Sequence, residues 1–193
     1  MGELATVNSV GQALASQLDL EALIELVGEQ VRATFQADLA YVALHDRPSG
    51  RIDFAYYYEN GRRRDERSMA YGEGLTSRII ESRAPLLLNR SPQFEEHEAW
   101  NVGTPVRSYL GVPILLGEAA IGVISVQSIE DEGRFGETDS RLLATIAANV
   151  GVAIQNARLF SEVELRRERL ADAVHRCELA HALTRLVEEP SVV

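Results

Sequence analysis

The chain has 193 residues, 46% of them hydrophobic and 25% charged, which suffices for one folded domain plus an extension and differs from the composition of a disordered protein. Its formal net charge of −10, with no lysine, offers no basic footprint for nucleic acid. A single cysteine excludes an intrachain disulfide and a zinc finger, and without a signal peptide or a long apolar run we expect a cytoplasmic protein with no direct membrane contact.

Two amphipathic helices are expected at the N-terminal end. Between Leu4 and Phe35 the apolar residues recur at the spacing of one helix face. The pattern breaks at the sequence SQLDLEA. There Asp19 is a suitable N-cap, because its carboxylate accepts hydrogen bonds from the first free N–H groups of the second helix.

A series of short strands follows these helices. Residues 37–46 and 52–61 are rich in apolar and β-forming residues, and the turn formers Pro48 and Gly50 separate them, which predicts a hairpin. An arginine-rich segment and a further extended stretch come next. A glycine-rich entry then leads into a short helix that ends near Pro85, and the sequence LLLN forms another short strand.

Residues 89–106 show no periodicity and contain two prolines, an acidic cluster and the only tryptophan, so they are predicted to form a long functional or mobile loop. Two further strands, 107–116 and 119–129, are expected to pair as a hairpin. Within the first of them, Pro113 suits a position whose N–H no neighbouring strand needs. Gly111 lets another element approach the strand backbone closely.

From Glu137 a helical pattern of roughly fifty residues runs without proline, longer than a typical globular helix. Its apolar residues follow a heptad spacing with two polar interruptions: Phe160, Val163, Arg167, Leu170, Val174, Cys177 and His181. Such a stripe on a helix that leaves a domain predicts a homodimer through the terminal helices, with the first N-terminal helix packed beside it. Polar positions in the seam favour shifts between registers, as a signalling element needs.

Three stretches together resemble a GAF domain, the small sensory and regulatory module of signalling proteins: GEGLTSRIIESRAPLLLN, RSYLGVPILLGEAAIGVISVQ and FGETDSRLLATIAANVGVAIQNARLF. They match the family's Gly-x-Gly-Leu before a short helix, its Val-Pro and Ile-Gly-Val strands, its Phe-x3-Asp before an apolar helix and its closing Asn-Ala-Arg-Leu. The resemblance covers residues 1–163, including the N-terminal helix. It implies an α+β fold with a central antiparallel sheet, helices packed on one face and a long C-terminal helix, so that residues 164–193 form a signalling helix or coiled-coil extension.

The residues of this chain give little support to the catalytic or chromophore-binding activities that some members of this family have. The sole cysteine, Cys177, lies in the terminal helix, which argues against cysteine-dependent methionine sulfoxide reductases and against bilin attachment. Haem ligation by His97 stays open, although a loop histidine among glutamates is more often solvated. For cyclic nucleotides, Phe135 matches the family pattern, but Gln127 and Ser128 stand where Asn and Lys are expected. No enzyme activity is therefore expected.

What remains is a pocket for a small polar or anionic molecule between the sheet and the loops that cover it. Unpaired N–H groups at the entry of the short helix can hold an anion, and Ser125 and Gln127 share one strand face because they are two residues apart. No metal site is expected and the cofactor is unknown. The candidate ligand-binding residues are Gly74, Thr76, Ser77, Trp100, Thr104, Arg107, Tyr109, Ser125 and Gln127.

The resemblance thus implies a non-catalytic small-molecule sensor that transmits ligand state through a dimeric terminal helix. The signal would reach an output domain, such as a kinase or cyclase, in a larger signalling protein. The alternative is a ligand-free structural dimerisation module with a collapsed pocket. An open cavity containing Arg107, Ser125 or Gln127 favours sensing, whereas a filled apolar cavity under Trp100 favours the structural module.

Overall fold

The computed structural model describes residues 20–64, 67–97 and 104–188. The chain divides into two compact units. The first, Asp19–Gln155, contains the sheet and the helices that cover it. In the second, the described residues are 156–188, the C-terminal part of one long helix.

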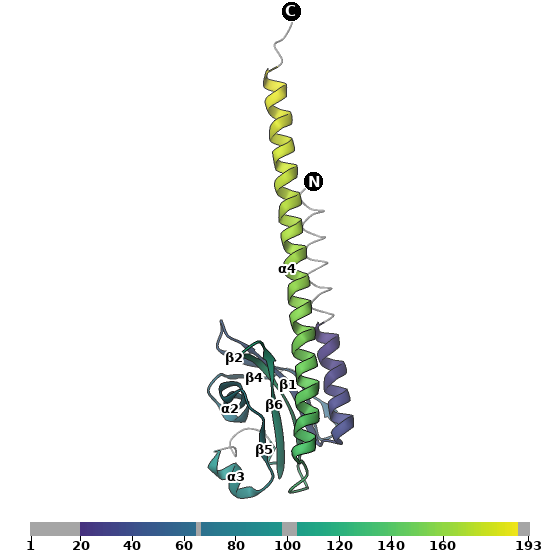
Figure 1. The fold of residues 1–193 in the computed structure, drawn as a ribbon, viewed down its shortest axis with the longest axis vertical. Coiled ribbons are helices and arrows are strands. Elements are labelled where there is room, and N and C mark those ends of the chain that lie inside the picture. Colours follow the sequence, from purple (N-terminus) through teal and green to yellow (C-terminus); the bar gives the residue numbers. More distant parts are fainter. Residues whose placement is uncertain (1–19, 65–66, 98–103, 189–193) are drawn as a thin grey trace, which may run out of the picture. The chain divides into compact units, whose positions relative to one another are not determined.

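The first unit is built on one antiparallel sheet (Figure 1). It has seven strands in the order β3-β2-β1-β7-β6-β5, with β4 also paired to β2. The strands are β1 (Leu39–Asp46), β2 (Arg51–Glu59), β3 (Arg62–Arg63), β4 (Arg67–Ala70), β5 (Leu86–Leu88), β6 (Ser108–Leu116) and β7 (Ala119–Ser128). The helices are residues 20–35, α2 (Gly74–Ser82), α3 (Ser91–Glu96) and α4 (Glu137–Glu188).

Both faces of this sheet are covered, because successive residues of β1 and β7 are buried rather than alternate ones. Helix 20–35 and the first part of α4 pack on one face (Figure 1). There Val31 and Leu143 join the core. On the other face, hereafter the α2 face, Ile79 of α2 and Phe94 of α3 pack against the strands. The expected α+β fold with its central antiparallel sheet and long C-terminal helix is confirmed. The two long helices share one face as expected, and the short helices α2 and α3 cover the second.

The α2 helix lies against the sheet where β6 has no side chain. A Cβ atom on Gly111 would lie 2.5 Å from Cδ1 of Ile79, closer than two such atoms can approach. This is the close approach that the sequence predicts for Gly111. Strand β5 pairs with β6 only up to Gly111, so no strand flanks β6 on that side at Pro113, as expected for a residue without an N–H.

The described part of the stretch 89–106 contains a helix that its lack of periodicity did not predict. Helix α3 begins where the side chain of Gln93 accepts hydrogen bonds from the backbone N–H groups of Asn89 and Arg90, at 2.7 and 3.1 Å. The buried ring of Phe94 fixes the helix to the core. A helix of six residues is too short to show a helical period in the sequence, which explains the difference.

Candidate functional site

A group of hydrogen-bonded hydroxyls is buried between α2 and the centre of the sheet. The Oη of Tyr41 on β1 lies 2.8 Å from Oγ1 of Thr76 on α2 and 2.7 Å from Oη of Tyr109 on β6. The hydroxyl of Ser125 on β7 lies next to both phenols and lowers the pKa of each. All four residues are at most 5% exposed. We call them the hydroxyl cluster, and they connect α2 to three adjacent strands.

The strand register explains why these side chains meet. Tyr41 pairs with Ser125, and Ser125 pairs with Gly111, so the three residues form one row across β1, β7 and β6. Gly111 leaves the space in that row into which the neighbouring tyrosine folds, since a Cβ there would lie 2.7 Å from Oη of Tyr109. Gln127 occupies the next row and donates from Nε2 to Oγ of Ser125 at 3.4 Å.

Aromatic rings close the cluster on the β2 side. The ring of Tyr41 meets that of Phe54 edge to face at 5.1 Å between centroids, and it stacks on Tyr57 at 6.3 Å. Phe54 and Tyr57 also pack edge to face, at 5.8 Å. These rings exclude water, so the hydroxyls depend on one another for hydrogen bonds.

Burial determines the protonation state of the two tyrosines. It raises the pKa of Tyr41 above the usual range, although hydrogen bonds from Thr76, Tyr109 and Ser125 partly offset this effect. Burial also raises the pKa of Tyr109 well above its usual range, and the neighbouring Tyr41 adds to the shift. Both phenols are therefore neutral near pH 7 and can donate or accept a hydrogen bond.

These shifts predict a loss of stability at alkaline pH. A tyrosine whose pKa is raised by folding stabilises the native state below the unfolded pKa of about 10, and the stabilisation is lost as the pH rises further. We expect urea unfolding between about pH 8 and pH 11 to show a falling free energy of unfolding, with a smaller fall in Tyr109→Phe. Burial also raises the pKa of Tyr56, so part of the fall in the free energy of unfolding remains in this variant.

The exposed Tyr71 provides the control for this pH series, because Tyr71→Phe removes a phenol that lies outside the hydroxyl cluster. We expect Tyr71→Phe to retain the alkaline fall of the wild type. An alkaline fall that is equal in Tyr109→Phe and in the wild type would contradict the assigned role of burial at Tyr109.

The structure brings four of the nine sequence-predicted site residues together: Thr76, Tyr109, Ser125 and Gln127 all lie buried on the α2 face. Two others form the entry of α2. Gly74 adopts a positive φ of 66°, and the hydroxyl of Ser77 accepts from the N–H of Gly72 and donates to the carbonyl of Glu73. Of the remaining three, Thr104 hydrogen-bonds to Glu59, Arg107 is exposed, and Trp100 lies outside the described residues.

Sequence reasoning missed Tyr41 and Glu59 on this face. Glu59 is 4% exposed, accepts a hydrogen bond from the hydroxyl of Thr104 and lies 3.4 Å from Nε of Arg64. The register places it in the row of Gln127, across Leu39. The signal that could have found it is the spacing of two from Tyr57 to Glu59, which places a carboxylate on the same strand face as an aromatic residue.

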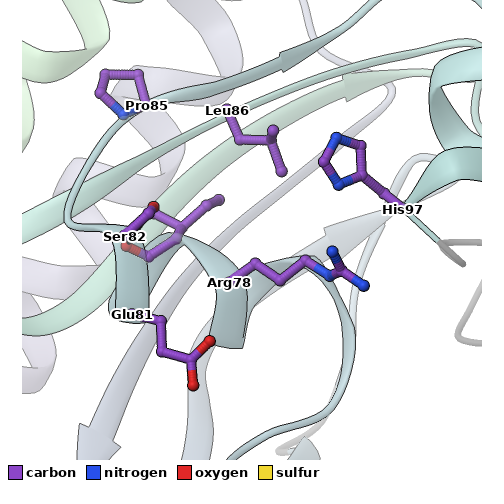
Figure 2. A pocket seen from close by; sticks show the side chains of 7 residues that line it. Arg78, Glu81, Ser82, Pro85, Leu86 and His97 are labelled. Atoms are coloured by element: carbon purple, nitrogen blue, oxygen red, sulfur yellow. Dashed lines mark hydrogen bonds between the residues drawn. The ribbon is translucent and has the colours of Figure 1, made fainter.

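A surface pocket of about 430 Å³ lies beside α2, between that helix, β5 and the end of α3 (Figure 2). Its lining includes Arg78, Ser82, Leu86 and His97, none of which was a predicted ligand-binding residue apart from the open possibility of haem at His97. In the described part of the chain, no group of His, Cys, Asp or Glu residues is arranged to hold a metal ion. Nor does any described helix have the length and apolar character needed to cross a membrane.

Comparison with known proteins identifies the family of this fold. A family model described as a GAF domain matches residues 17–155. The formate hydrogenlyase transcriptional activator of Salmonella typhimurium (strain SL1344) is 25% identical over 174 residues, covering 85% of this chain and 25% of that protein. The Nif-specific regulatory protein of Azospirillum brasilense is 27% identical over 172 residues, covering 83% and 27%. The chain thus spans about a quarter of the length of these curated relatives.

A solved structure shows that the same fold also occurs in an enzyme. The free methionine-R-sulfoxide reductase of Neisseria meningitidis, in complex with its substrate, aligns with a TM-score of 0.63 and 18% sequence identity. The alignment covers 77% of this chain and 85% of that one. A likeness at this identity concerns the fold alone, so function is argued from the residues of the site.

Proposed function

Because the chain belongs to the GAF domain family, we propose that it is a non-catalytic regulatory domain that senses a small molecule on the α2 face of its sheet. The observation that supports this most is the hydroxyl cluster, in which Thr76 ties α2 to Tyr41 and Tyr109 of the central strands. A ligand that competes for these hydrogen bonds would change the position of α2. The curated relatives are named as a transcriptional activator and a regulatory protein, which fits a regulatory role.

Strand β6 is the proposed route from the site to α4. At one position of the strand, Gly111 contacts Ile79 of α2. Near its end, the carbonyl oxygen of Leu115 lies so close to Gly151 of α4 that a Cβ there would collide with it. A displacement of α2 would therefore be transmitted through a hydrogen-bonded strand to the backbone of α4.

We propose no catalytic role for the site. Among the described residues, the hydroxyl cluster bonds to other hydroxyls and to the amide of Gln127, and neither a histidine nor a carboxylate hydrogen-bonds to it. Activation of a hydroxyl nucleophile needs such a base within hydrogen-bond reach. The raised pKa of Tyr41 and Tyr109 also disfavours the anionic phenolate.

The remaining predicted site residues complete this proposal. Gly74 and Ser77 shape the entry of α2, while Thr104 and Arg107 precede β6, the strand that carries the cluster residue Tyr109. Trp100 remains a predicted lid residue. We propose that these residues bind or enclose the ligand, together with Thr76, Tyr109, Ser125 and Gln127.

Dimerisation through the C-terminal part of α4 is the second element of the proposal. Phe160, Val163 and Leu170 are 67%, 60% and 67% exposed, and they follow the spacing of a coiled-coil seam. A second copy of the chain is the occupant we propose, because a heptad stripe is complementary to itself. The proposed output domain lies in a longer cytoplasmic protein. To the kinase or cyclase expected from the sequence we add a transcription-regulating domain, in line with the names of the relatives.

The dimer is tested by placing a charge in the seam. We expect the wild-type chain to be dimeric in size-exclusion chromatography with light scattering, and Val163→Glu to be monomeric, because a buried unpaired carboxylate opposes association. Leu165→Glu is the matched control, since Leu165 is also exposed but lies outside the heptad stripe. A dimeric Val163→Glu, or loss of the dimer in both variants, would contradict the proposed seam.

The structural dimerisation module remains the alternative to sensing, and its support is that the described hydroxyls satisfy one another without a ligand. Native mass spectrometry of the chain, mixed with a metabolite extract of its expression host, separates the two proposals. Sensing predicts a defined added mass that is lost on denaturation and reduced in Thr76→Val. The mass of the polypeptide alone would favour the structural module.

A further inference from the structure

The pocket beside α2 is lined by both charged and apolar side chains. Figure 2 shows the side chains of Arg78 and His97 together on one side of the pocket, with Pro85 and Glu81 on the opposite side. Leu86 and the buried Ile79 supply the apolar lining. A volume of about 430 Å³ is within the range of pockets that hold small molecules.

His97 contributes a buried nitrogen that lacks a partner. Its Nδ1 is buried, and no described residue hydrogen-bonds to it. A buried polar atom left in this state is destabilising, so the ring gains stability if it turns this nitrogen towards the pocket and bonds to a ligand there. The guanidinium of Arg78 likewise forms no ion pair with any described residue, although it is exposed to solvent.

We infer that this pocket binds a small monocarboxylate with an apolar chain. The carboxylate accepts hydrogen bonds from the guanidinium of Arg78 and from an imidazole N–H of His97, both of which suit a planar anion. The apolar chain lies over Leu86 and Pro85. Glu81 at the opposite side disfavours a second negative charge on the ligand, which excludes dicarboxylates and phosphate as good ligands.

The pocket is joined to the hydroxyl cluster by one side chain. Ile79 lines the pocket, and its Cδ1 also sits over Gly111, next to the space filled by Oη of Tyr109. Occupancy of the pocket would therefore alter the contact between α2 and β6. The regulatory meaning of the inference rests on the proposed sensory function, whereas the binding itself can be measured separately.

Hexanoate is the probe for this site, with hexanamide as its uncharged counterpart of nearly equal shape. In a titration of the full 193-residue chain followed by ¹H–¹⁵N NMR, we expect saturable hexanoate shifts at the amides of α2 and at the ring of His97. Hexanamide should bind at least about tenfold more weakly, because it has no charge for charge-assisted hydrogen bonds. Inorganic phosphate should also bind at least about tenfold more weakly, because it has no apolar chain to contact the apolar lining.

Variants assign the binding to named residues. We expect Arg78→Gln and His97→Gln each to weaken hexanoate binding about tenfold or more, while Arg62→Gln, at an exposed arginine of β3, retains wild-type affinity. The dispersion of the NMR spectrum reports whether each variant is folded. Lack of saturable shifts, or unchanged affinity in both Arg78→Gln and His97→Gln, would overturn the inference.

The same titration separates this inference from the proposed function. Saturable binding that leaves the amides of residues 147–155 unshifted would support the monocarboxylate site and contradict a sensory role for it. Absence of hexanoate binding, with a small molecule still found by native mass spectrometry, would overturn the monocarboxylate site and leave sensing through the hydroxyl cluster in place.

Discussion

Gly111→Ala is expected to lower the free energy of unfolding by about 1–3 kcal/mol, the usual cost of an added methyl group in a packed core. The new Cβ would lie 2.5 Å from Cδ1 of Ile79 and 2.7 Å from Oη of Tyr109. Both neighbours are buried, so relief requires α2 to move away from β6 or Tyr109 to leave its hydrogen bond. Urea unfolding followed by circular dichroism measures the change.

Gly136→Ala is the matched control for this substitution. A Cβ on Gly136 would meet only Oδ2 of Asp139, at an ordinary distance of 3.9 Å. We expect its free energy of unfolding to stay within about 0.5 kcal/mol of the wild type. Equal losses of unfolding free energy in the two variants would show that the packing of α2 on Gly111 does not cause the destabilisation of Gly111→Ala.

Tyr41→Phe is expected to lower the free energy of unfolding by about 2–3 kcal/mol, because one buried hydroxyl serves two partners. Removing Oη leaves Thr76 and Tyr109 without the atom to which both of them bond. The ring remains, so its contacts with Phe54 and Tyr57 are retained and no large cavity is formed. The lost free energy of unfolding therefore measures the contribution of the hydrogen bonds and not that of the ring packing.

Tyr58→Phe controls for the removal of a phenolic hydroxyl elsewhere on the sheet. Tyr58 packs with the helix 20–35 side of the core, and its ring lies under the guanidinium of Arg32 at 4.5 Å, a contact that phenylalanine retains. We expect a change within about 0.5 kcal/mol. A loss in Tyr58→Phe as large as that in Tyr41→Phe would contradict the special role of the hydroxyl cluster.

Much of the fold followed from local patterns. The apolar runs separated by turn residues predicted the two central hairpins, and the long proline-free pattern after Glu137 predicted α4. The spacing of two between Ser125 and Gln127 correctly indicated a shared face. The sequence could not show that this face is the buried α2 face, since burial on both sides depends on which helices cover the sheet.

The site was less accessible to sequence reasoning, because its contacts join distant segments. Tyr41 reads as a core aromatic residue in an apolar strand, and only the register of β1 with β7 and β6 brings its hydroxyl to Tyr109. The pocket of Arg78 and His97 arises where α3 returns towards α2, and α3 itself was not predicted. Strand register and short capped helices are tertiary properties that a single sequence specifies weakly.

A displacement of α2 is proposed to reach α4 through β6. Hydrogen–deuterium exchange of Thr76→Val, compared with the wild type, tests it without a known ligand, because the substitution removes the bond between α2 and Tyr41. We predict faster exchange in α2 and also at residues 147–155 of α4, where Gly151 contacts the end of β6. Faster exchange confined to α2, with residues 147–155 unchanged, would contradict the claim.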